Sequence, residues 1–128
     1  MSYYFARIVN APFADVVARA KAALAERGFG ILSEIDVAQT LKAKVGANLA
    51  PYVILGACNP HHASRALQVE DKIGVMLPCN VIVRQASAGS VEVAAVDPVK
   101  SMQAVQNPTL AEVAATVQTL LRQAIDAI

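Results

Sequence analysis

The chain has 128 residues, which suits one domain spanning residues 1–128 and leaves no room for a second independent core. Its 11 basic and 10 acidic residues form no basic stripe or basic amphipathic helix, which argues against nucleic-acid binding and membrane-surface binding. Hydrophobic residues make up 55% of the chain but aromatic residues only 5%. Because a small chain can bury excess apolar surface between subunits, we expect a homodimer; the alternative is a monomer with an alanine-rich core.

The N-terminal residues have no apolar core of the signal-peptide type. Val45 to Ser64 carries no charged residue, but the Asn, Pro, Gly and His residues within it argue against a membrane span. We therefore expect a cytoplasmic protein, in which two cysteines would be reduced thiols.

Tyr3 to Val9 is rich in aromatic and β-branched residues and predicts the first strand. Pro12 suits the start of a helix, where its missing N–H costs nothing. Apolar residues then recur at helical spacing, and Gly28 predicts the end of this helix. Phe29 to Ile35 is the second predicted strand.

Asp36 predicts a cap for a short helix that continues through Leu41 to Val45. Tyr52 to Ala57 is the third predicted strand and is apolar on both faces. Asn59 and Pro60 then suit the N-cap and the first residue of another short helix.

Ile73 to Val83 is predicted to be extended, but Pro78 interrupts it, which indicates an edge, a bulge or a break into two pieces. A turn then leads into a strand from Val91 to Val96. The clearest element is a last helix whose apolar stripe runs from Leu110 to Ile128. Thr109 predicts its start by capping-box spacing, and Asn107 offers a competing start.

The connections between the later strands are too short for parallel crossovers, so the sheet should be largely antiparallel. Helices packed on one face of that sheet would give a two-layer α+β domain.

Two segments combine a cysteine, an asparagine and a proline near a strand end: Gly56-Ala-Cys-Asn-Pro60 and Leu77-Pro-Cys-Asn80. Cys58 precedes a helix start, where the helix dipole favours a thiolate, so we expect it to be the more reactive thiol. If the two strands are neighbours, Cys58 and Cys79 should line one pocket. The structural alternative is that both cysteines are small buried hydrophobes.

Zinc could in principle be held by two thiols and two imidazoles from Cys58, His61, His62 and Cys79. Their spacing matches no standard finger, and adjacent histidines on a helix point about 100° apart. We therefore predict no metal site and no cofactor. The sequence also has no nucleophile elbow, phosphate-binding loop or dinucleotide-binding motif.

The same segments resemble the DUF302 family, whose name denotes a domain of unknown function. The resemblance rests on three blocks, which begin at Phe29, Tyr52 and Ile73 and end at Val37, Pro60 and Val83. It implies a β-α-β4-α fold described as TBP-like, a dimeric assembly and no established activity. The family motif also implies candidate site residues, which are Cys58, Asn59, Pro60, Pro78, Cys79 and Asn80.

The sequence supports two hypotheses about function. The first is a small dimeric domain that binds a small ligand near the two Cys-Asn segments, through Tyr52, Gly56, Cys58, Asn59, Pro60, Cys79 and Asn80. The second is a thiol-dependent redox protein or enzyme that uses Cys58, Cys79 or both. We favour ligand binding, because the sequence offers no assured base beside a thiol.

Overall fold

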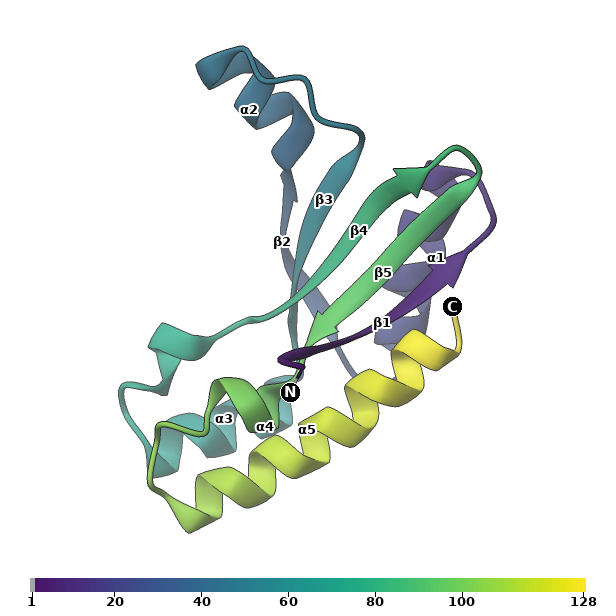
Figure 1. The fold of residues 1–128 in the computed structure, drawn as a ribbon. Coiled ribbons are helices and arrows are strands. Elements are labelled where there is room, and N and C mark those ends of the chain that lie inside the picture. The colour runs from purple at the N-terminus through teal and green to yellow at the C-terminus, as the bar shows by residue number, and fades with distance from the viewer. Residues whose placement is uncertain (1) are drawn as a thin grey trace.

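The computed structural model describes residues 2–128 and centres on one antiparallel sheet (Figure 1). The five strands lie in the spatial order β1-β5-β4-β3-β2, so β1 closes the edge beside β5. Their bounds are Tyr4–Val9 for β1, Gly30–Asp36 for β2, Tyr52–Cys58 for β3, Cys79–Ser87 for β4 and Ser90–Val96 for β5. The predicted α+β fold with a β-α-β4-α order is confirmed, with shorter helices inserted between the strands.

Two helices build the core against one face of the sheet: α1 (Phe13–Glu26) and α5 (Pro108–Asp126). Alternate residues of the central strands turn toward them and are buried, as Leu55, Val81 and Val93 show. The predicted stripe of the last helix is confirmed, since it buries Leu110, Val113, Val117, Leu121, Ala124 and Ile125. These apolar residues belong to one continuous hydrophobic cluster.

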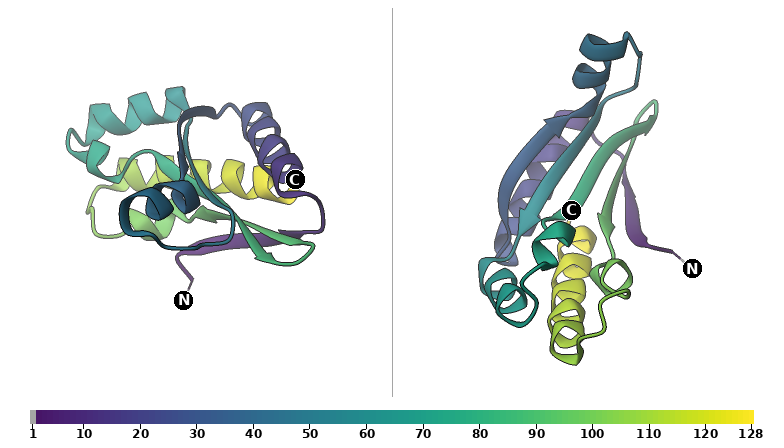
Figure 2. Two further views of the ribbon diagram at one scale, coloured as in Figure 1. Left: turned by 90° about the horizontal axis from the view of Figure 1, so that it is seen from above. Right: turned by 90° about the vertical axis from the view of Figure 1, so that its left-hand side faces the viewer.

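The remaining helices lie around the ends of the sheet (Figure 2). Helix α3 (Pro60–Val69) and the short helix α4 (Pro98–Ser101) pack against α5, and the 3-10 helix η1 (Ile73–Met76) packs against α3. Helix α2 (Val37–Val45) is different, because it contacts mainly the adjoining strands β2 and β3 and projects beyond the sheet (Figure 1).

Several predicted helix ends are confirmed by their hydrogen bonds. Asp36 caps α2, because its Oδ1 accepts a 2.9 Å bond from the Gln39 amide. Helix α5 uses the competing start: the Asn107 side chain accepts bonds from the amides of Thr109 and Leu110, and Pro108 is the first helical residue. Gly28 follows α1 with a φ of 84°, a left-handed conformation that favours glycine.

One local prediction is wrong, and a second holds only in part. Residues 73–76 form a 3-10 helix rather than extended chain, because the pairing of β4 with β3 begins only at Cys79, opposite Ala57, and the preceding residues have no strand partner. Asn59 occupies the N-cap position of α3 but makes no side-chain cap. Its Nδ2 instead donates to the Arg27 carbonyl at 3.3 Å, which ties the start of α3 to the turn after α1.

Candidate functional site

Most side chains on the second face of the sheet are half-buried or exposed, and no helix of residues 2–128 packs across this face (Figure 1). We call this second face the open face, and the register of the paired strands determines which residues share it. In β3 and β4, Tyr52 lies opposite Arg84, Ile54 opposite Ile82, and Gly56 opposite Asn80. The same rows continue into β5 and β1, where they add Glu92, Ala94, Val96, Tyr4, Ala6 and Ile8.

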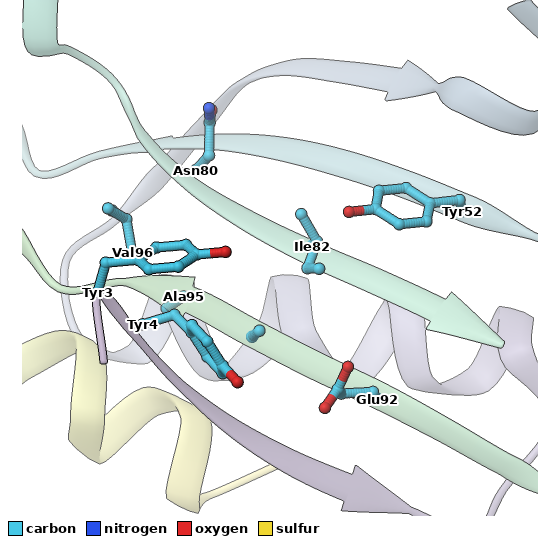
Figure 3. A pocket seen from close by; sticks show the side chains of 9 residues that line it. Tyr3, Tyr4, Tyr52, Asn80, Ile82, Glu92, Ala95 and Val96 are labelled. Carbon is cyan, nitrogen blue, oxygen red and sulfur yellow. The ribbon is translucent and has the colours of Figure 1, made fainter. Parts of the chain in front are cut away.

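A cleft of about 380 Å³ lies on the open face (Figure 3). Its floor is apolar and comes from the central strands β4 and β5, while tyrosines from β3 and the N-terminal residues form its sides. The lining residues are Tyr3, Tyr4, Tyr52, Asn80, Ile82, Glu92, Ala94, Ala95 and Val96. This volume falls in the range of roughly 300–1,000 Å³ that small-molecule sites occupy.

All three tyrosines of the chain line this cleft, and the chain has no tryptophan. Its three phenylalanines belong to the core instead: Phe29 is buried, and Phe5 and Phe13 pack against the core cluster. Tyrosine differs from phenylalanine by a hydroxyl that can stay hydrogen-bonded while the ring covers an apolar partner. The tyrosines, which carry a hydroxyl, therefore line the cleft, whereas the phenylalanines, which do not, pack in the core.

The cleft has few polar groups, and its one carboxylate is paired with a neighbouring cation. Arg84 Nε donates to Glu92 Oε1 at 2.7 Å, so the carboxylate has a cation beside it. The rings of Tyr3 and Tyr4 meet edge to face, with centroids 5.1 Å apart. In Figure 3 the hydroxyls of Tyr3 and Tyr52 point toward each other from opposite sides of Ile82, and the Asn80 amide stands at one end. The cleft therefore offers aromatic walls, hydroxyls and one amide.

A second, much smaller cavity lies at the end of the sheet and contains both cysteines. It measures about 30 Å³, close to the volume of one water molecule. Cys58 lines it from the end of β3, Asn59 and His62 from the start of α3, and Cys79 from β4. Both cysteines are free thiols, Cys58 half-buried and Cys79 buried. The two cysteines thus lie beside the same small cavity.

Burial raises the pKa of the Cys79 thiol to about 11, and the neighbouring Cys58 adds to the shift. Cys79 is 7% exposed and lies on the covered side of the sheet, opposite Ala57. It therefore stays protonated at neutral pH and is a poor nucleophile. Among the described residues, no group of three or more His, Cys, Asp or Glu side chains is placed to hold a metal ion.

The structure divides the predicted site residues into separate groups. Tyr52 and Asn80 line the cleft, while Cys58, Asn59 and Cys79 line the small cavity. Pro60 is the exposed first residue of α3 and lines neither space.

Gly56 lies between these groups and lines neither space. A Cβ on this glycine would lie 2.9 Å from Pro78 Cγ and would overlap the Ser33 hydroxyl. The glycine therefore allows two side chains of the protein to pack closely over β3.

Tyr3, Tyr4, Ile82 and Glu92 line the cleft but are not among the residues predicted from the sequence. Two signals pointed to them. Tyr3 and Tyr4 are two of only three tyrosines in the chain. Strand alternation from Asn80 also leads to Ile82 on the same face, and pairing with β5 then leads to Ala94 and Glu92.

The fold and the cleft together define a small α+β protein whose antiparallel sheet is covered by helices on one face only. Within that class the chain belongs to the DUF302 family, because the model for "Domain of unknown function DUF302" matches residues 5–128. The fold is similar to the crystal structure of an uncharacterized conserved DUF302 protein from Bacillus stearothermophilus, with a TM-score of 0.91 and 28% sequence identity. The match covers 99% of this chain and 98% of that one. No curated protein matches the chain.

None of the helices in residues 2–128 is long and apolar enough to cross a membrane.

Proposed function

We propose that the protein is a homodimeric domain that binds a small ligand in the cleft on the open face of its sheet. The observation that carries the proposal is the cleft of about 380 Å³, into which all three tyrosines and Asn80 project. Apolar concave sites with a few placed polar groups are the usual form of small-molecule sites. Asn80 belongs to the second Cys-Asn segment, so the cleft lies near the region that the sequence indicated.

The chemistry of the cleft favours a flat, uncharged ligand with hydrogen-bonding groups at its edge. Ile82, Ala94 and Val96 supply an apolar floor, and tyrosine rings can stack on an aromatic ring or meet its edge. The ion pair between Arg84 and Glu92 leaves no unpaired charge to attract an ion. The Asn80 amide can both donate and accept a hydrogen bond, as the edge of an aromatic heterocycle requires.

Tyrosine fluorescence tests this proposal directly, because every tyrosine lies in the cleft and the chain has no tryptophan. Adenine, indole and riboflavin would be titrated as uncharged aromatic probes, with correction for their own absorbance. We expect at least one of them to change the emission saturably. Asn80→Arg, which places a long cation in the cleft, should weaken that binding by more than about tenfold.

Gln123→Arg provides the matched control, because Gln123 is exposed on α5 and lies outside the cleft. It should bind as the wild type does. Equal binding by the wild type and the Asn80→Arg variant would place the ligand elsewhere. No saturable change with any probe would count against this ligand class.

A second candidate function, thiol-dependent redox or enzyme chemistry, is favoured by one observation: Cys58, Cys79 and His62 line the same cavity. An imidazole is the usual base beside a reactive thiol. Because burial holds Cys79 protonated, Cys58 would be the reacting thiol. Iodoacetamide labelling of the native protein, mapped by mass spectrometry, tests this. Rapid labelling of Cys58 supports the thiol function, and labelling only after denaturation rejects it.

We also infer that the protein works in a reducing compartment such as the cytoplasm, because both thiols are free. We expect no nucleic-acid partner, even for a fold described as TBP-like. The net charge is +1, and affinity for nucleic acid depends on clustered basic residues rather than on fold.

A further inference from the structure

Helix α2 and residues 46–51 form a projecting segment, which we call the arm (Figures 1 and 2). No residue of α2 is buried, although Val37, Leu41 and Val45 recur at helical spacing. Val45 is 73% exposed, and Leu49, which follows in the arm, is 43% exposed. A helix of nine residues is marginal in water without tertiary packing, so the arm lacks the apolar partner that its sequence requires.

The open face of the sheet lacks a partner as well. Large apolar side chains remain exposed on both of its edge strands: Tyr4 and Ile8 on β1, and Ile35 on β2. Between them the central strands contribute Ile54 and Ile82, which are only half-buried. This apolar surface therefore crosses all five strands and is continuous with the base of the arm.

We infer that a second copy of this chain covers the open face. The two open faces meet about a two-fold axis, and each arm packs against the sheet of its partner and closes the partner's cleft. In a two-fold contact the same surface serves both copies, so the arm and the open face supply each other's missing apolar partner. This inference rests on the proposed homodimer.

The exposed apolar area supports a second copy as the occupant. The large exposed side chains of the open face and arm sum to on the order of 600 Å², at the upper end of what a monomer leaves uncovered. They are Tyr3, Tyr4, Ile8, Ile35, Val45 and Leu49. A stable interface buries about 800 Å² on each partner, which this surface approaches before its half-buried residues are added.

The dimer would also complete the cleft. In one copy the cleft is open above Ile82, and Tyr3 at its rim is 71% exposed. A partner packed across the face would remove water from this rim and place the tyrosine hydroxyls inside the assembly. The ligand would then be held between two subunits rather than on the surface of one.

Sedimentation velocity of the full chain between about 1 and 100 µM tests the inference, with circular dichroism to confirm folding. Two variants place a carboxylate in the proposed interface: Ile8→Asp on the open face and Val45→Asp on the arm. Val75→Asp is the matched control, because Val75 is 84% exposed on η1, away from both surfaces. We expect the wild type and Val75→Asp to sediment with twice the chain mass. The dimer dissociation constants of the other two variants should rise by more than about tenfold.

The possible results separate this inference from the homodimer on which it rests. A wild-type monomer over the whole range would reject both. A wild-type dimer that either folded variant retains at wild-type strength would reject the interface described here and leave the homodimer in place. Val45→Asp serves where Ile8→Asp fails to fold, because Val45 is exposed and contributes nothing to the core.

Discussion

The two cysteines line one cavity, but burial distinguishes their thiols. Cys79 is inside the core cluster, where a thiolate would lose its hydration and face the neighbouring Cys58. Its pKa is therefore raised to about 11, from an ordinary value near 9.0. A folded-state pKa above the unfolded value means that the folded protein holds the proton more tightly.

This shift makes stability fall at alkaline pH. The contribution of the buried thiol is fully present below about pH 9 and is lost as pH rises toward about 11. We expect the wild type to lose roughly 2–3 kcal/mol of unfolding free energy across that interval from this group. Urea unfolding at pH 8, 9, 10 and 11 would measure the loss.

Replacing Cys79 by alanine should flatten this part of the pH dependence, although the variant starts from a lower stability because it leaves a small cavity. Cys58→Ser is the control and should keep most of the alkaline loss, because burial is the larger cause of the raised pKa of Cys79 and the Cys58 thiol the smaller one. If Cys79→Ala and the wild type lose stability in parallel, another group controls the alkaline behaviour.

Strand alternation explains why the site residues predicted as one group line two separate spaces in the structure. Cys79 and Asn80 are consecutive residues of β4, and consecutive side chains of a strand point to opposite faces. Cys79 therefore enters the core while Asn80 enters the cleft. Strand alternation was available from the sequence. The position of Cys58 was not, because it depends on how the chain leaves β3 for α3.

At the level of single helices, hydrogen bonds show which of the predicted N-caps form. Asn107 and Asn59 both precede a proline at the start of a helix, yet only Asn107 caps its helix. Asn107 Nδ2 also donates to the Val69 carbonyl at 2.9 Å, so its cap and its tertiary bond are compatible. Asn59 makes only the tertiary bond, from its Nδ2 to the Arg27 carbonyl. A sequence motif cannot indicate such a bond, because the bonding partner is remote in the chain.

The last helix gives the clearest test at this scale. Val117 is 9% exposed on the face of α5 that joins the core cluster, whereas Ala115 is exposed two residues earlier. Val117→Asp would bury an unpaired carboxylate and should cost more than about 3 kcal/mol of unfolding free energy. Thermal unfolding followed by circular dichroism would show it.

Ala115→Asp is the matched control, because it introduces the same carboxylate into the same helix on its solvent side. It should cost no more than about 1 kcal/mol, chiefly through helix propensity. Equal melting temperatures for the two variants would mean that the apolar stripe of α5 does not form the core.

At the level of the whole molecule, composition led to the expectation of a homodimer but could not say which surface two copies would share. Hydrophobic residues make up 55% of the chain, and within residues 2–128 the long helices α1 and α5 pack on one face of the sheet. Antiparallel pairing and the long last helix were predictable because they follow from short connections and helical spacing. Which face stays open was not predictable, because it depends on how α1 and α5 pack on the finished sheet.

Dimerisation makes thermal stability depend on protein concentration, because only the folded state associates. For a homodimer of this chain, we expect the Tm to rise by about 2–4 °C for each tenfold increase in concentration. Differential scanning calorimetry at about 5, 50 and 500 µM would measure this. Val45→Asp should make the Tm nearly independent of concentration, whereas Val75→Asp should keep the wild-type slope. A wild-type Tm that stays constant over this range would show that the open face is not covered by a second copy when the protein unfolds.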